Sequence, residues 1–242
     1  MESNNQKDLD ILFIGKAGDF FSRQAADFIV THYPSAKIIY STRQQVFPLE
    51  LLNWKGDVII SYLSQWIIPK KLLENARVAA LNFHPGPPEY PGIGCTNFAV
   101  YNEEDTFGVT CHHMVPQVDT GQIVAVSRFP VFETDTVFSI THVCYSHILT
   151  LFYTIFPLLM RNEALPVSPE KWKRRPYLRL ELDELCRLTP DMGVTEIERR
   201  IRATDYIQPW AFMQVGDEVF KLTAEEVKNK HYLAYLSQPN LS

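Results

Sequence analysis

The stretch "DILFIGKAGDFFSRQAADFIVTHY", residues 10–33, joins a short apolar run that ends at glycine to a segment with helical spacing. Its apolar residues recur at the intervals of one helix face: Phe20, Phe21, Ala25, Phe28 and Ile29. Further strand-like runs follow at 36–42, 57–63 and 78–84, separated by segments that can hold a helix, such as "PKKLLENA" at 69–76. This alternation predicts an α/β fold with a Rossmann-like, mostly parallel sheet.

The middle of the chain changes pattern. "FGVTCHHMV" (107–115) and "GQIVAVSRFPV" (121–131) read as two consecutive strands joined by the turn around "PQVDTG". A long helix is expected from about Thr134 to Met160, with Thr134, Asp135 and Thr136 able to cap its start.

The last quarter of the chain has shorter and more polar elements. We predict an amphipathic helix over 193–204 and a hairpin over 211–223, whose turn is Gly216-Asp217. The sequence therefore suggests a main domain at 9–165 and a small C-terminal α+β extension at 176–235.

Composition narrows the class of partner. The chain has 242 residues, is 46% hydrophobic and carries a net charge of −5, so no global basic field attracts it to nucleic acid or to an anionic membrane. The apolar stretch at 148–160 contains Pro157 and is shorter than the roughly 20 residues that a spanning helix needs, so we interpret it as a buried helix. A small-molecule partner is expected.

Four cysteines lie far apart in the sequence and form no C-x-x-C pair: Cys95, Cys111, Cys144 and Cys186. This pattern fits neither a disulfide framework nor a zinc site, and a reducing cytoplasm is the simplest compartment. The start "MESNNQKDLD" is polar and acidic, unlike an export signal. His112 and His113 alternate on their strand and cannot both face one metal, so no metal is expected.

The stretch "LNFHPGPPEYPGIG", residues 81–94, carries the candidate chemistry. Alternation along a strand places Asn82 and His84 on one side, while Leu81 and Phe83 point into the core. Pro85 ends the strand, and the prolines and glycines beyond it form a stiff loop that can wall a pocket. In parallel α/β sheets ligands bind at this end of the strands.

An amide and an imidazole suit acyl transfer to an amine, because one can stabilise an oxyanion and the other can exchange a proton near neutrality. Asp119, in "VPQVDTGQIV", is the candidate acid that would orient the imidazole. Alternatives remain at this point: N-x-H can simply cap a loop, and D-T-G is often a plain turn. An aspartic protease would need two D-T-G motifs among all-β strands, and only one occurs.

Taken together, "LNFHPGPPEYPG", "GVTCHHM" and "QVDTGQIV" resemble, in order and spacing, the folate-dependent formyltransferase family over roughly residues 9–165. The resemblance implies that Asn82, His84 and Asp119 are catalytic and that N10-formyltetrahydrofolate is the formyl donor. It implies that Asn82 and a protonated His84 stabilise the oxyanion formed when an amine attacks the formyl group, while Asp119 favours the imidazolium. The proton that moves from the amine to the departing folate nitrogen could pass through His84 or through a water.

The same resemblance implies a folate groove built largely from main chain, near the acid and within "SYLSQWIIPKKLL". The candidate cofactor residues are Ser64, Gln65, Trp66, Ile67, Ile68, Val118 and Gly121. The alternative is that Trp66 and the isoleucines belong to the core.

The acceptor is suggested by the tail. Residues 180–242 hold seven Lys and Arg against eleven Asp and Glu, which argues against a tRNA backbone as partner. "RATDYIQPWAFMQVGDEVFKL" resembles sugar nucleotide N-formyltransferases, although Trp210 stands where several relatives have glycine. The resemblance implies a nucleotide-linked 4-amino-4,6-dideoxy sugar, dTDP-linked, used for surface polysaccharide such as the O-antigen of lipopolysaccharide. Glycinamide ribonucleotide, methionyl-tRNA and a non-catalytic folate- or nucleotide-binding role are the alternatives.

Candidate acceptor contacts are mostly aromatic: Pro87, Tyr90, Tyr206, Trp210 and Phe212. Lys16, with Gly15 and Gly18, precedes a helix N-terminus and could approach a phosphate. The alternatives are aromatic residues that form the core of the tail and a lysine that is merely solvated. The hairpin and the apolar tail suggest a homodimer.

Overall fold

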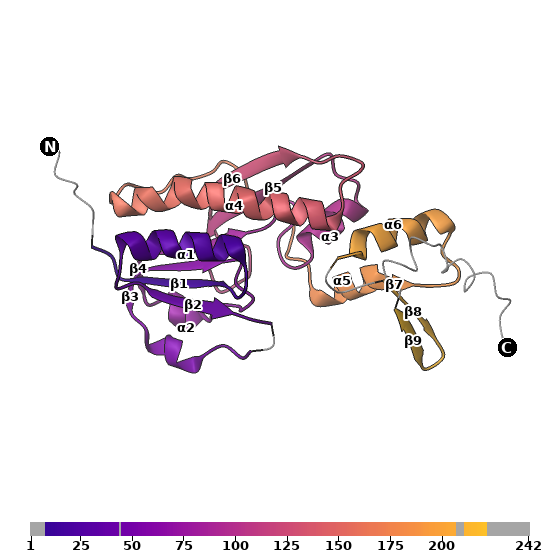
Figure 1. Cartoon of the computed structure of the whole chain (residues 1–242), viewed down its shortest axis with the longest axis horizontal. Helices are drawn as coiled ribbons and strands as arrows, with labels where there is room; N and C mark the ends of the chain where they lie inside the picture. The colour runs from indigo at the N-terminus through magenta and orange to yellow at the C-terminus, as the bar shows by residue number, and fades with distance from the viewer. Residues whose placement is uncertain (1–7, 44, 207–210, 222–242) are drawn as a thin grey trace. The chain divides into compact units, whose positions relative to one another are not determined.

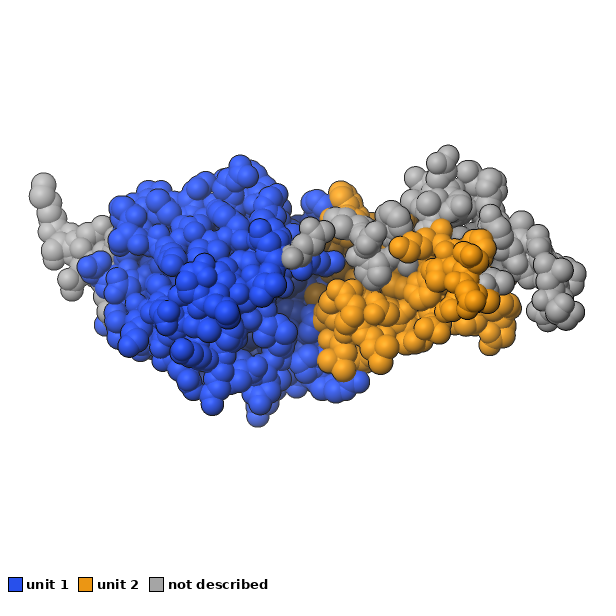
Figure 2. All heavy atoms as spheres, turned by 90° about the horizontal axis from the view of Figure 1, so that it is seen from below, with its two compact units in different colours: residues 1–92, 106–129, 142–176 blue, residues 93–105, 130–141, 177–242 orange. Residues whose placement is uncertain are grey.

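The computed structural model describes residues 8–43, 45–206 and 211–221 of the chain (Figure 1), so the predicted contact Trp210 lies outside the described residues. The chain divides into two compact units (Figure 2). Unit 1 comprises 1–92, 106–129 and 142–176, and unit 2 comprises 93–105, 130–141 and 177–242.

A six-stranded sheet forms the centre of unit 1 and confirms the mostly parallel α/β prediction. Its strands are β1 (Ile11–Lys16), β2 (Lys37–Ser41), β3 (Gly56–Tyr62), β4 (Ala76–His84), β5 (Thr106–His113) and β6 (Ile123–Pro130). Their order is β2-β1-β3-β4-β5-β6, and the first three pairings are parallel while β5 runs antiparallel to β4. The carboxyl ends of β1, β3 and β4 therefore meet at one edge.

Apolar side chains cover both faces of this sheet. One face carries the adjacent rings of Phe13, Tyr62 and Phe83, and Phe152 packs on the last two at centroid distances of 5.9 and 5.6 Å. The other face carries a cluster that includes Leu12, which packs with the short η1 (Leu49–Asn53) and α2 (Lys70–Leu73). The sheet is thus buried on both sides, as parallel sheets require.

The two longest helices begin at side-chain caps. In α1 (Phe20–His32) the Asp19 carboxylate accepts the Ser22 N–H at 2.7 Å. In α4 (Val137–Met160) the Thr136 hydroxyl oxygen accepts the Ser139 N–H at 3.1 Å, which confirms the predicted capping region.

Helix α4 is longer than the apolar stretch counted in the sequence. Among the described residues it is the one helix that is long and apolar enough to cross a membrane, by length and composition alone. Yet Cys144, Ile148 and Phe152 are fully buried, and Phe156 packs against Phe28 of α1 with centroids 6.1 Å apart. This is the packing of a core helix.

Unit 2 contains α3 (Cys95–Tyr101), α5 (Arg179–Cys186), β7 (Arg187–Leu188), α6 (Val194–Thr204), β8 (Phe212–Val215) and β9 (Glu218–Lys221). The predicted helix and hairpin are confirmed as α6 and β8–β9, and Gly216 turns the hairpin at φ 59°. The helices α3 and α5 were not predicted. A small core of Leu188, Ile197, Ile201, Ala211 and Met213 holds α6 against the three-stranded sheet β7-β8-β9.

Candidate active site

Strand β4 presents two polar side chains at its carboxyl end. Leu81 and Phe83 are each 1% exposed, and Asn82 and His84 alternate with them. The antiparallel partner β5 places His112 directly opposite Asn82. The pleat therefore brings an amide and two imidazoles to one place.

The Pro/Gly loop after β4 folds back onto the strand. The Thr110 hydroxyl donates to the Gly86 carbonyl at 2.8 Å, and the Tyr90 N–H donates to the Pro87 carbonyl at 2.9 Å. The Tyr90 carbonyl in turn accepts the Nε2–H of His84 at 2.9 Å. The loop thus holds the imidazole with main-chain atoms.

Asp119 completes the arrangement from the turn between β5 and β6. Its Oδ2 lies 3.3 Å from His84 Nδ1 and accepts the Gly92 N–H at 2.8 Å. Its Oδ1 lies 3.1 Å from His112 Nε2 and 3.3 Å from Asn82 Nδ2. The structure therefore brings together the three predicted catalytic residues, and the carboxylate lies within reach of the ring.

The backbone of Asp119 is in a costly conformation. Its φ is 45°, in the left-handed region that a residue with a side chain seldom adopts. Such strain persists only where the surroundings enforce it, and it is found most often at functional sites. Here four nitrogen atoms converge on the carboxylate, which is 5% exposed.

Burial raises the pKa of Asp119, but His84, the hydrogen bond from His112 and the Gly92 N–H outweigh burial and lower the pKa to about 2. The group is therefore ionised at neutral pH. Both ring nitrogens of His84 face acceptors, the Tyr90 carbonyl and the Asp119 carboxylate. Each ring nitrogen of His84 therefore has an acceptor to which an N–H could donate.

His112 is a further member of the site, which the sequence left without a definite role. Its Nδ1–H donates to the His113 carbonyl at 2.8 Å, so its Nε2 faces both Asn82 and Asp119. His113 is half-buried, and burial together with His112 lowers its pKa. The only signal for His112 would have been its antiparallel register with Asn82, which a single sequence does not show.

Trp172 was also missed, because it follows α4 in a polar linker. Its Nε1–H donates to the Gly121 carbonyl at 2.7 Å, and its ring lies 5.0 Å from the His112 ring and 6.0 Å from the His84 ring. No motif marks this residue.

Asn82 and His84 direct their donors at protein atoms. Both contacts of the Asn82 amide nitrogen are to His112 and Asp119, and the His84 Nε2–H is on a carbonyl. To stabilise an oxyanion, an N–H has to leave one of these acceptors. Catalytic hydrogen bonds commonly form fully only when substrate is bound.

The predicted cofactor segment follows β3. Ser64 lies within hydrogen-bond distance of the Trp66 backbone, and the Gln65 N–H donates to the Ser41 hydroxyl at 2.8 Å. Ile67 is 71% exposed, whereas Ile68 is 7% exposed and belongs to the apolar cluster, on which Trp66 also packs. In the other predicted cofactor segment, next to Asp119, Val118 is 40% exposed.

Gly121 lies where a side chain does not fit. A Cβ at this position would stand 1.8 Å from the His113 carbonyl oxygen. The turn that carries Asp119 can therefore lie this close to β5 only because residue 121 has no side chain.

Three predicted acceptor contacts belong to unit 1. The Lys16 amine donates to the Tyr145 hydroxyl at 2.9 Å, and burial lowers its pKa. Pro87 is buried, and the Tyr90 ring is 4% exposed and packs on Phe107. Tyr90 therefore acts on the site through its carbonyl, and its ring has little surface left for a ligand.

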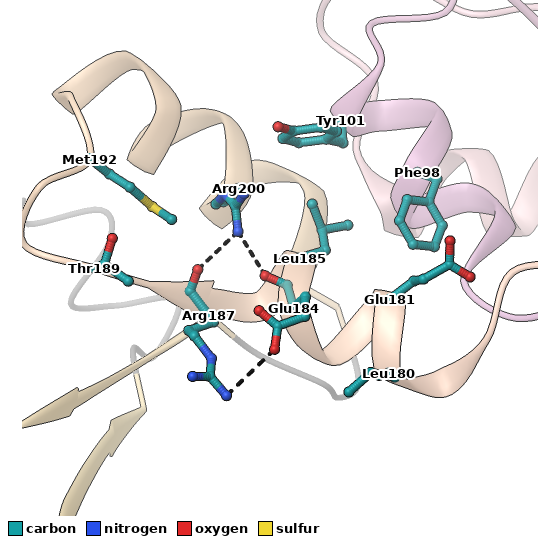
Figure 3. Close-up of a pocket in the computed structure, with 10 residues that line it drawn as sticks. All are labelled: Phe98, Tyr101, Leu180, Glu181, Glu184, Leu185, Arg187, Thr189, Met192 and Arg200. Carbon is teal, nitrogen blue, oxygen red and sulfur yellow. Dashed lines mark hydrogen bonds and ion pairs between the residues drawn. The ribbon is translucent and has the colours of Figure 1, made fainter.

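Two more predicted contacts belong to unit 2. Tyr206 packs edge-on against Phe138 with centroids 5.2 Å apart, and Phe212 lies in β8 beneath the Arg187 guanidinium. Unit 2 also contains a pocket of about 470 Å3 with apolar walls that include Phe98 and Met192 (Figure 3).

The polar groups of this pocket are bonded within unit 2. Arg200 Nη1 donates to the carbonyls of Glu184 and Arg187 (Figure 3). The Arg200 Nε pairs with the Glu196 carboxylate. Among the described residues that line the pocket, no charged side chain is therefore left without a partner and available to a ligand. In the described part of the chain, no group of three or more His, Cys, Asp or Glu is placed to hold a metal ion.

Comparison with known proteins gives both a family and a fold. A family model described as formyl transferase matches residues 16–146, more than half of the chain. A sugar N-formyltransferase from a Shewanella species is 18% identical and has a TM-score of 0.70, over 90% of this chain and 97% of that chain.

Two other solved structures have the same fold. A 4-N formyltransferase from Francisella tularensis is 18% identical with a TM-score of 0.68, over 88% of this chain and 96% of that one. An N-formyltransferase from Helicobacter canadensis, in complex with folinic acid and dTDP-3-aminofucose, is 17% identical with a TM-score of 0.66, over 86% and 85%. At these identities the likeness extends to the fold and leaves the acceptor open.

Proposed function

Because this chain belongs to the formyl transferase family, we propose that it moves a formyl group from N10-formyltetrahydrofolate to the amine of a nucleotide-linked 4-amino-4,6-dideoxy sugar, most simply a dTDP-sugar. The observation that carries this proposal is the buried Asp119 carboxylate held between His84 and His112 beside the Asn82 amide. It provides donors and a proton carrier at the end of the sheet where ligands of parallel α/β folds bind.

Each residue of the site has a separate role in the proposed reaction. His84, protonated beside Asp119, donates through Nε2 to the negative charge that develops on the formyl oxygen, once that N–H leaves the Tyr90 carbonyl. Asn82 is the second donor to the same oxygen. Asp119 keeps the proton on His84 Nδ1, and His112 and the Gly92 N–H hold Asp119 in place. The amine loses a proton as it attacks and the departing folate nitrogen gains one; this transfer passes through His84, which gives up one proton and receives the other, or through a water.

The chain offers a suitable surface for the donor. Ile67 and Val118 expose apolar side chains on the two segments that the family pattern assigns to the folate, and apolar surface suits a flat heteroaromatic ring. When bound, the donor supplies the activated formyl group. Ser64, Gln65 and Gly121 would contact it mainly through main chain, whereas Ile68 and Trp66 would support the wall from the core.

Positively charged side chains close to the site support an acceptor that carries a nucleoside diphosphate. The linker that carries Trp172 contains Lys171, Lys173, Arg174 and Arg175, four cations within five residues of an otherwise acidic protein. Lys173 is fixed beside the Pro/Gly loop, because its N–H donates to the Pro88 carbonyl at 3.0 Å. Arginine and lysine are the usual partners of phosphate oxygens.

The finer assignments follow from the same reasoning. The complex of the Helicobacter canadensis protein with folinic acid and dTDP-3-aminofucose supports folate and a dTDP-sugar as the first ligands to test, and the description of the Francisella tularensis protein as a 4-N formyltransferase supports the 4-amino position. We further propose a homodimer, since Val219 and Phe220 are exposed on the edge strand β9. We place the enzyme in the cytoplasm, where it would serve surface polysaccharide synthesis, because its four cysteines are buried and are not joined in disulfides.

A direct assay tests the proposal. The protein is mixed with N10-formyltetrahydrofolate and each of four acceptors: dTDP-4-amino-4,6-dideoxyglucose, a dTDP-3-amino sugar, glycinamide ribonucleotide and methionyl-tRNA. Release of tetrahydrofolate is followed, and the product is identified by a mass increase of one formyl group. We expect turnover with the 4-amino sugar.

Variants in the site provide the control. Asn82→Ala and His84→Ala are each expected to lower turnover by roughly 10²–10³-fold while remaining folded. Turnover with glycinamide ribonucleotide and none with sugars would overturn the acceptor. Folate or dTDP binding by thermal shift without turnover on any acceptor would favour a non-catalytic binding protein.

A further inference from the structure

The linker between α4 and α5 contains a segment, residues 168–173, that is fastened across the active site of unit 1. The Ser168 N–H donates to the Ile123 carbonyl of β6 at 3.0 Å, and the Lys173 N–H donates to Pro88 in the Pro/Gly loop at 3.0 Å. Between them, Glu170 pairs with Arg128, which also pairs with Glu89 of the loop. The segment is therefore tied to both structures that frame the site.

Trp172 is the residue of this segment that reaches the chemistry. Its indole meets His112 at an interplanar angle of 87° and His84 at 71°, so both imidazoles that flank Asp119 have an edge contact with one ring. Aromatic rings favour edge-to-face contacts of this kind, which add stabilisation beyond the area that they bury. The half-buried indole also covers the two imidazoles that flank the ionised carboxylate.

The indole N–H holds the turn that carries the acid. It donates to Gly121, two residues after Asp119, and the other side of Gly121 is pressed against the His113 carbonyl. Asp119 itself sits at a positive φ that its surroundings have to enforce. The His113 N–H of β5 also donates to the Gln122 carbonyl at 2.9 Å, so without the indole the turn would keep this main-chain tie and lose the side-chain hydrogen bond at Gly121.

We propose that Trp172 is a positioning residue: its N–H clamps the turn of Asp119 and its ring fixes His84 and His112, so that a residue outside the family's matched region sets the geometry of the site. The kinetic part of this inference rests on the proposed formyl transfer. The clamp itself does not, since it concerns contacts within unit 1.

Two variants separate the ring from the N–H. Trp172→Phe keeps an aromatic ring and removes the donor, whereas Trp172→Ala removes both. Trp54→Phe is the matched control, because Trp54 packs against the apolar cluster around Leu12 in the same unit and has no part in the site. Amide hydrogen exchange over residues 115–122 reports the turn without any substrate.

We expect Trp172→Phe to speed exchange in 115–122 and to lower kcat several-fold, with both KM values unchanged, and Trp172→Ala to lower kcat by about tenfold or more. The control should show neither effect. Wild-type exchange in 115–122 for Trp172→Phe would overturn the clamp, and a raised acceptor KM at constant kcat would make Trp172 a substrate contact instead. If the wild type transfers no formyl group to any acceptor, the proposed function fails and the exchange result alone decides the clamp.

Discussion

Replacing Asp119 by asparagine tests the core of the site, because the two side chains have the same shape and differ in charge. Every contact of the carboxylate is with a nitrogen: His84 and the Gly92 N–H at Oδ2, His112 and Asn82 at Oδ1. An amide has one oxygen and one NH2 group. On one side of the new side chain, an N–H donor must therefore face a group that is itself a donor. The main-chain N–H of Gly92 cannot reverse, which forces the NH2 group toward His112 and Asn82.

The size of the effect follows from the ion pair. The pKa of Asp119 is lowered from 3.8 to about 2, which corresponds to roughly 2–3 kcal/mol of stabilisation of the charged form by its partners together. If most of this stabilisation is exerted on the imidazolium in the transition state, its loss slows the reaction by roughly 10–10²-fold. The reversed amide adds to this loss, because Asn82 must turn away to accept a hydrogen bond. We therefore expect kcat of Asp119→Asn to fall by at least roughly 10²-fold.

The assay is formyl transfer under saturating donor and acceptor, with Asp57→Asn as the control. Asp57 is also a largely buried carboxylate of unit 1, but it pairs with Arg77 on another part of the sheet. The circular dichroism spectra of both variants should match the wild type. A kcat of Asp119→Asn within threefold of the wild type, in a folded protein, would refute the role of the carboxylate.

Three other predictions concern stability. The pKa of Asp119 is lower in the folded chain than its ordinary 3.8. Its contribution to the free energy of unfolding is therefore complete above pH 4 and is lost as the pH falls toward 2. Between pH 5 and pH 3, urea unfolding should show a larger loss of stability for the wild type than for Asp119→Asn. Tyr62→Phe should raise the free energy of unfolding by about 1 kcal/mol, because the buried Tyr62 hydroxyl has no hydrogen-bond partner among the described residues; a loss of stability would contradict this. Gly121→Ala should cost about 1–3 kcal/mol and reduce kcat, since its Cβ would overlap the His113 carbonyl, whereas Gly193→Ala, with open space around it, should show no such clash in the same thermal scans.

The periodic parts of the sequence predicted the elements of the fold that depend on local pattern. The strands β1 to β4 are apolar runs between helical segments, and their parallel order follows from that alternation. Asn82 and His84 could be placed because alternation on β4 and the break at Pro85 decide which way they point. The position of Asp119 near them came from the resemblance, since a single D-T-G does not say what the turn faces.

The remaining features depend on contacts that are distant in sequence. His112 joins the site through its antiparallel register with β4, and Trp172 arrives from a linker with no periodicity. The short helix α3 has no cap signal, because its N-cap is Gly94 at φ 72°. The extent of α4 followed from its periodicity and its capping residues, whereas its apolar stretch at 148–160 covers only the second half of the helix.

The site is held mainly by backbone atoms, and this explains why its sequence signature consists of glycine and proline as much as of catalytic side chains. The Tyr90 carbonyl orients His84, the Gly92 N–H anchors Asp119, and the Gly121 carbonyl receives the indole of Trp172. Gly92 has φ 90°, and Gly121 has no room for a side chain, so these positions accept few other residues. A substitution that kept Asn82, His84 and Asp119 but altered these backbone supports would therefore remove the geometry while leaving the polar motif intact. The spacing of the glycines is thus as informative about the chemistry as the polar residues are.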